Sequence, residues 1–121
     1  MIIYSHPKCT TCKKALKWLE ENNISFEVKD IREEHPTSEE LQVLVERSGL
    51  PLTKVFNTSG ELYRKLGLKD VIKTMETSKA MELLASDGML IKRPLLVSDE
   101  AVFFGFKEEQ YEQLLKGESN D

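Results

Sequence analysis

Two cysteines, Cys9 and Cys12, lie three positions apart near the start of the chain, and they are its only cysteines. An apolar run at residues 1–4 precedes them, and an amphipathic stretch from about residue 10 to residue 21 follows. The pair is therefore predicted where a strand turns into a helix. There, unpaired backbone N–H groups and the positive end of the helix dipole favour a thiolate. We predict that Cys9 attacks a substrate and that Cys12, more shielded inside the helix, resolves the mixed disulfide.

The charged residues near the two cysteines indicate what kind of substrate would bind there. No acidic residue occurs in the first 18 positions, whereas four lysines do: Lys8, Lys13, Lys14 and Lys17. Such a cluster is either an ordinary solvated helix face or an electropositive field that lowers the thiol pKa and attracts anions. In the second interpretation Lys8, Thr10 and Thr11, at the start of the helix, contact an anionic substrate.

A second candidate element is the Arg93–Pro94 pair, which follows a predicted loop and precedes a hairpin strand. We interpret Pro94 as the point at which the backbone passes close to the cysteines, and a cis Arg93–Pro94 bond is plausible there. The alternative is an ordinary proline in an edge strand. Arg93 is a permanent cation that faces a thiolate or binds an oxyanion with two hydrogen bonds, unless it is simply solvated. His6 either assists a thiolate or is a half-exposed turn residue, and we favour the turn residue.

The cysteine pair fits a metal site poorly. A structural zinc site takes about four ligands, and only His6 and His35 are available besides the two cysteines. We therefore predict no metal. The remaining alternative is a helix that merely carries two buried, redox-inert cysteines, because a free cysteine packs well as a small hydrophobe.

Length and composition exclude several classes of protein. The 121 residues suit one domain with a buried core, and 40% hydrophobic and 31% charged residues are typical of a globular protein. The net charge of −4 argues against direct binding to nucleic acid, which needs a basic face. No apolar run reaches the ~20 residues of a membrane span, and no secretory signal is recognisable. We expect a cytoplasmic monomer whose thiols are mostly reduced.

The secondary-structure elements predicted around the candidate site residues alternate between strand and helix. Residues 2–5 and 24–28 are predicted as strands on either side of the helix at 10–21, which makes a βαβ unit with parallel strands. The middle of the chain is predicted to be helical and contains a capping box from Thr37 to Glu40. A β-hairpin and a last helix follow, between residues 89 and 116. The prediction is a compact α/β sandwich of four strands with an all-helical insertion.

Three segments together resemble a known family. They are Tyr4-Ser5-His6-Pro7-Lys8-Cys9-Thr10-Thr11-Cys12, Leu90-Ile91-Lys92-Arg93-Pro94-Leu95 and Gly105-Phe106-Lys107-Glu108-Glu109. They resemble the arsenate reductase-like (ArsC) family, which also contains the Spx and MgsR transcription regulators. The resemblance covers nearly the whole chain. It implies a single domain, 1–121, with a thioredoxin-like (glutaredoxin-like) core of about 1–32 and 88–117, a mixed four-stranded sheet, and a helical insertion of about 33–87.

The resemblance also implies roles for particular residues. In the family, the proline of the Arg-Pro pair is a cis-proline that faces the active cysteine. Glutaredoxin-coupled arsenate reductases have one active cysteine in this turn, matched by Cys9, and hold the oxyanion with three arginines. Arg93 matches one of these arginines. The other two fall near Asn57 and Phe106, where this chain has no cation, and Lys107 can partly substitute.

Two functions follow from the resemblance. The first is a thiol–disulfide redox protein in which Cys9 is the nucleophile and Cys12 the resolving thiol. It would reduce an oxyanion or a disulfide without a bound cofactor, with glutathione and glutaredoxin or with thioredoxin as reductant. The second is an Spx-like regulator, in which the Cys-x-x-Cys is a redox switch for binding the C-terminal domain of the RNA polymerase α subunit. We favour the first.

Overall fold

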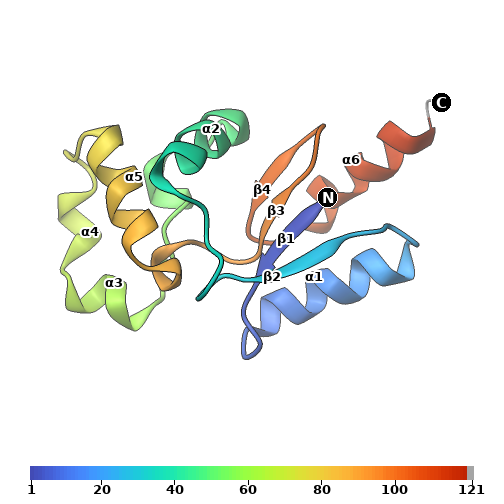
Figure 1. The fold of residues 1–121 in the computed structure, drawn as a ribbon, viewed down its shortest axis with the longest axis horizontal. Helices are drawn as coiled ribbons and strands as arrows, with labels where there is room; N and C mark the ends of the chain where they lie inside the picture. Colours follow the sequence, from blue (N-terminus) through green and yellow to red (C-terminus); the bar gives the residue numbers. More distant parts are fainter. Residues whose placement is uncertain (120–121) are drawn as a thin grey trace.

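The computed structural model describes residues 1–119, and its centre is a four-stranded sheet (Figure 1). The strands are β1 (Ile2–Ser5), β2 (Glu27–Asp30), β3 (Leu95–Val97) and β4 (Val102–Phe104), in the spatial order β2-β1-β3-β4. β1 and β2 are parallel, whereas β3 is antiparallel to both β1 and β4. The predicted mixed sheet is confirmed. Among the described residues no helix is long and apolar enough to cross a membrane.

Two helices cover one face of the sheet: α1 (Thr10–Glu21) and α6 (Glu108–Ser119). The core on this side joins Ile3 of β1, Leu19 of α1 and Tyr111 of α6, all fully buried. The amphipathic pattern of α1 explains the arrangement, because its apolar side packs on the sheet while its lysines are exposed.

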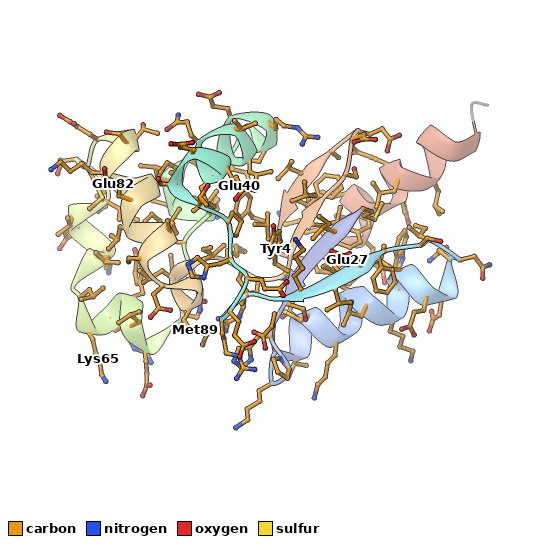
Figure 2. The ribbon with its side chains drawn as sticks, viewed as in Figure 1. Tyr4, Glu27, Glu40, Lys65, Glu82 and Met89 are labelled. Carbon is orange, nitrogen blue, oxygen red and sulfur yellow. The ribbon has the colours of Figure 1, made fainter. Side chains whose placement is uncertain are left out.

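The other face of the sheet carries the helical insertion (Figure 1). Its elements are α2 (Ser38–Ser48), the 3-10 turn η1 (Leu52–Lys54), α3 (Glu61–Lys65), α4 (Leu68–Val71) and α5 (Thr77–Ser86). The 3-10 turn η2 (Gly88–Leu90) follows directly, where the chain returns to the core. α2 packs along α5, and Tyr4 of β1 belongs to the core between the sheet and these helices (Figure 2). The capping box predicted for α2 is present: Thr37 and Glu40 each accept the backbone N–H of the other.

The second strand begins later than its sequence pattern predicts. Residues 24–28 alternate between apolar and polar, but pairing with β1 begins only at Glu27, which lies opposite Ile2. The reason is that Ile24 closes α1. Its N–H donates to the carbonyl of Leu19 at 3.0 Å, and its side chain is buried in the core beneath that helix.

The first strand of the predicted β-hairpin, β3, is also shorter than predicted. β3 begins at Leu95, because the side chain of Asp87 accepts the N–H of Met89 at 2.8 Å and winds this segment into η2. After η2, Ile91 forms an isolated antiparallel bridge with Phe56 of the insertion. This bridge fastens the insertion beside the chain that leads into β3.

Candidate functional site

Cys9 is the N-cap of α1, and its side chain is partly exposed. Its Sγ accepts the backbone N–H of Cys12 at 3.2 Å, which satisfies one of the unpaired donors of the helix end. His6 shapes the preceding loop: its carbonyl accepts the N–H of Cys9 and its Nδ1 accepts the N–H of Lys8, both at 3.1 Å. The strand, the loop and the helix together present one sulfur to solvent at a helix N-terminus.

Cys12 lies in the first turn of α1 and is fully buried. Burial, followed by a hydrogen bond with the side chain of Cys9, raises the pKa of Cys12 to about 11. Hydrogen bonds with the backbone of His6 and with the side chain of Ser5 act in the opposite direction and lower this pKa. Cys12 is thus a protonated thiol at neutral pH, behind the exposed sulfur of Cys9.

His6 is a loop-forming residue in the structure. Partial burial and the neighbouring charge of Arg93 lower the pKa of His6, so its ring is neutral at pH 7. A neutral Nδ1 is what the hydrogen bond from Lys8 requires. Among the side chains that the structure describes, residues 1–115, no three from His, Cys, Asp or Glu come together as a metal site would need.

Cys9 opens into a cleft of about 470 Å³, lined by parts of the insertion and by the segment that enters α6. Four cations line it: Lys54 at the end of η1, Lys92 and Arg93 before β3, and Lys107 before α6. No Asp or Glu is among the lining residues, although the whole chain carries a net charge of −4. Positive side chains around a concave surface concentrate anions there.

Backbone pairing between the insertion and the core places two of these cations. The N–H of Lys92 donates to the carbonyl of Val55 at 2.9 Å, and the N–H of Asn57 donates to the carbonyl of Leu90 at 2.8 Å. This short two-stranded contact holds Lys54 and Asn57 of the insertion beside Lys92. The cleft is therefore formed by the insertion and the thioredoxin-like core together.

The Arg93–Pro94 peptide bond is cis, as the resemblance implies. Pro94 is buried outside the cleft lining, and its carbonyl accepts the N–H of Gly105 at 2.8 Å. Arg93 lines the cleft, and its Nη1 donates to the thioether sulfur of Met89 at 3.5 Å. Met89, labelled in Figure 2, belongs to η2, which directly follows the insertion. The guanidinium is thus held between η2 and the space that Cys9 faces.

The structure brings together some of the predicted site residues and separates others. Four of them line one cleft: Cys9, Thr11, Arg93 and Lys107. Cys12 lies behind Cys9 in the core of α1. Three others are not part of the cleft lining: Lys8 and Thr10, which are exposed near Cys9, and Pro94. The roles of all these residues in binding and catalysis stay predictions.

Two lining residues, Lys54 and Lys92, are absent from the sequence-based candidates. Lys92 lies in one of the segments that carry the resemblance, but nothing in that segment gives the lysine a role, and the contact that places both residues is a single bridge, too short to leave a periodic pattern. By contrast, Asn57 and Phe106 do line the cleft. These are the positions at which the resemblance places two further arginines, so the resemblance was informative about location even where the residue types differ.

The mixed sheet, the Cys-x-x-Cys at the start of the first helix and the cis-proline define a thioredoxin-like fold with a dithiol. The chain belongs to the ArsC family, whose profile matches residues 4–114. The Bacillus subtilis protein YusI is 52% identical over 93% of this chain and 96% of its own length. Regulatory protein MgsR of B. subtilis is 28% identical over 96% of this chain and 90% of its own length. The global transcriptional regulator Spx of Enterococcus faecalis is 25% identical over 95% of this chain and 86% of its own length.

Solved structures agree with this assignment. An ArsC family related protein from Bacteroides fragilis superimposes with a TM-score of 0.90 and 45% identity, over 93% of this chain and 95% of the other. Arsenate reductase from Vibrio cholerae superimposes with a TM-score of 0.80 and 29% identity, over 93% and 94%. The insertion and the core are thus both part of the shared fold.

Proposed function

We propose that the protein is a dithiol reductase for small anionic disulfides or oxyanions, with Cys9 as nucleophile and Cys12 as resolving thiol. Glutathione with glutaredoxin, or thioredoxin, regenerates the dithiol. One observation carries the proposal: the partly exposed sulfur of Cys9 accepts a helix N–H and opens into a cleft lined by four cations and no carboxylate. Membership of a family that contains arsenate reductases supports it.

With a disulfide R–S–S–R′ the reaction has two steps. The thiolate of Cys9 attacks one sulfur, forms Cys9–S–S–R and releases R′S⁻. Cys12 then loses its proton and attacks Sγ of Cys9, which forms the Cys9–Cys12 disulfide and releases the second thiol. The substrate gains two electrons and the protein loses two, which the external reductant returns. An oxyanion would be attacked by the same sulfur, with water as the first leaving group.

The composition of the cleft favours a disulfide that carries carboxylates over a compact oxyanion. Its volume of about 470 Å³ falls within the ~300–1,000 Å³ of small-molecule sites. A compact oxyanion is best held by arginine forks, and the cleft has one, Arg93. The other three cations are lysines, which act as separate point charges on flexible stems. Such an arrangement suits the separated carboxylates of a peptide disulfide such as glutathione disulfide.

Intact mass spectrometry tests the two roles separately. Reduced protein is incubated with glutathione disulfide or with arsenate, and the products are identified by mass. We expect the wild type to end as an internal disulfide, Cys12→Ser to stop at a mixed disulfide with glutathione, and Cys9→Ser to remain unmodified. Turnover is then measured as NADPH oxidation, with thioredoxin as the reductant when glutathione disulfide is the substrate, because glutathione would regenerate that disulfide, and with glutaredoxin or thioredoxin when arsenate is the substrate.

The controls for this experiment are the state of the thiols and the fold of the variants. Thiol titration before mixing confirms that both cysteines are reduced, and circular dichroism confirms that each variant is folded. If fully reduced, folded wild-type protein were left unmodified by both oxidants, the proposal would be wrong.

A second candidate function is favoured by the relatives. MgsR and Spx are named as regulators, and each aligns over at least 95% of this chain. In this alternative the dithiol is a switch that controls binding to the C-terminal domain of the RNA polymerase α subunit. Co-precipitation with that domain, using the reduced and the oxidised protein, distinguishes the two functions. Binding in one redox state supports the regulator, and absence of binding in both states removes it.

A further inference from the structure

Ser5 is a buried polar residue for which the fold alone gives no reason. It ends β1 and is 6% exposed. Among the described polar and charged residues, Ser98 is the other one that is buried, and it serves a turn: its hydroxyl accepts the N–H of Ala101 at 3.0 Å. Ser5 belongs to a strand, and burying a hydroxyl costs free energy unless a partner is near. Its surroundings therefore identify what it does.

The side chain of Ser5 faces the side of the sheet that α1 covers. Successive strand residues alternate between faces, so Ser5 shares a face with Ile3, which belongs to the same core cluster as Ala15 of α1. Cys12 lies one helical turn before Ala15 on the same buried side of α1. A short loop joins the end of β1 to the first turn of α1. Ser5 and Cys12 thus face each other across the strand–helix junction.

We infer that Ser5 is a positioning residue for the resolving step: its hydroxyl donates a hydrogen bond to the sulfur of Cys12 while that sulfur attacks Cys9. The inference rests on the proposed function, because only a resolving cysteine must ionise inside the protein. In this step the S–H bond of Cys12 breaks and its proton ends on the departing thiolate, RS⁻. The Cys9–Cys12 bond forms and the Cys9–S–R bond breaks, so the hydroxyl of Ser5 gains and loses no proton.

The groups around Cys12 show why a donor is needed there. Burial and the side chain of Cys9 raise the pKa of Cys12, whereas Ser5 and the backbone of His6 lower it. From α6, the hydroxyl of Tyr111 is buried without a hydrogen-bond partner in the described residues, and burial and then Cys12 raise the pKa of Tyr111. In the mixed disulfide Cys9 carries no charge and Tyr111 stays protonated, so burial is what opposes a thiolate at Cys12 in the resolving step. Ser5 and the His6 backbone are the groups that favour it.

The two chemical steps can be timed separately with one equivalent of 5,5′-dithiobis(2-nitrobenzoate). The first release of nitrothiobenzoate reports attack by Cys9, and the second reports attack by Cys12 on the mixed disulfide. In Ser5→Ala we expect the first step to keep its wild-type rate. The second step should be about tenfold slower, which corresponds to the loss of a hydrogen bond to a charged group. The pH profile of the second step should also move to higher pH.

Matched variants distinguish a role of the hydroxyl from a role of shape. Threonine and valine have nearly the same shape, so the second step should be fast in Ser5→Thr and slow in Ser5→Val. Ser98→Ala, at the other buried serine, should leave both steps unchanged. This pair keeps the test valid even if Ser5→Ala folds poorly.

The possible outcomes separate this inference from the proposed function. A second step of wild-type rate and pH profile in Ser5→Ala, or equal rates in Ser5→Thr and Ser5→Val, would overturn the inference and leave the dithiol reductase intact. Failure of the wild type to release a second nitrothiobenzoate would instead overturn the resolving role of Cys12, and the inference with it.

Discussion

The side chain of Lys92 packs against Gly105: a Cβ built on Gly105 would be 2.8 Å from Cε of Lys92. Gly105 also has a φ of +89°, in the left-handed region that L side chains rarely adopt. Both residues line the cleft of Cys9. The glycine therefore leaves the space in which one of the four cations reaches the cleft.

Gly105→Ala is predicted to impair both stability and reaction with an anionic disulfide. The backbone strain should lower the free energy of unfolding by about 1–2 kcal/mol, and the displaced Lys92 should slow the reaction of Cys9 with glutathione disulfide. Urea unfolding and stopped-flow kinetics measure the two effects. Gly67→Ala is the matched control, since Gly67 has a φ of +61° and nothing within 4 Å of an added Cβ. Gly67→Ala should lower the free energy of unfolding by the backbone strain alone and leave the reaction rate of Cys9 unchanged. Wild-type kinetics in Gly105→Ala would show that the contact between Gly105 and Lys92 does not affect the reaction.

Lys54 and Lys92 are predicted to select for negative charge on the substrate. Neutralising either one, as Lys54→Gln or Lys92→Gln, should slow the reaction with glutathione disulfide roughly threefold to tenfold at low ionic strength, because the attraction is electrostatic. The reaction with the uncharged hydroxyethyl disulfide should change little. Added salt should reduce the difference between wild type and variants.

The matched control for these lysines is Lys17→Gln. Lys17 is exposed on α1, pairs with Glu21 at 3.8 Å and is not among the residues that line the cleft. Its neutralisation changes the net charge by the same amount without changing the cleft. An equal slowing in Lys17→Gln would mean that overall charge, rather than the lining lysines, sets the rate.

The parts of the site that sequence predicts are those fixed by short-range physics. Cys9 at a strand–helix junction and the capping box of Thr37 depend on residues within one helical turn, so their patterns are visible in the chain. Lys54 and Lys92 line the same cleft only because the insertion pairs with the segment before β3, which no local pattern encodes. The late start of β2 has a similar cause, since Ile24 is buried by packing under α1 rather than by strand pairing.

Cys12 is predicted to make the fold less stable at alkaline pH. Its pKa in the folded protein, about 11, lies above its ordinary value of 9.0, so the folded state holds this proton more tightly than the unfolded state does. The resulting stabilisation is complete below pH 9 and is lost as the pH rises through 11. Urea unfolding across this range should show a smaller loss of stability in Cys12→Ala than in wild type.

Cys9→Ala is the control for this pH dependence, because it removes a cysteine and keeps the buried thiol. It should retain most of the alkaline loss seen in wild type. Burial, the larger cause of the raised pKa of Tyr111, is the same in all three proteins, whereas the smaller contribution of Cys12 to that pKa is absent from Cys12→Ala. If Cys12→Ala lost as much stability at alkaline pH as the wild type, the pKa of Cys12 would be the same in the folded and the unfolded protein.

Tyr111 is predicted to tolerate loss of its hydroxyl but not of its ring. The ring stacks on Phe103 with centroids 5.6 Å apart and meets Phe106 and Trp18 edge-on at 4.8 and 5.7 Å. The hydroxyl is buried without a partner in the described residues, and an unpaired buried hydroxyl is costly. Tyr111→Phe should therefore leave the free energy of unfolding unchanged or raise it by up to about 1 kcal/mol, whereas Tyr111→Ala should lower it by about 3–5 kcal/mol.

The same pair of variants tests whether the aromatic cluster supports the cleft. Phe106 contacts Tyr111 and lines the cleft, so Tyr111→Phe, which keeps the ring, should react at Cys9 with the wild-type rate. Tyr111→Ala removes the support of Phe106 and should slow that reaction in the protein that remains folded. A Tyr111→Phe variant destabilised by more than about 1 kcal/mol would mean that the hydroxyl makes a favourable hydrogen bond.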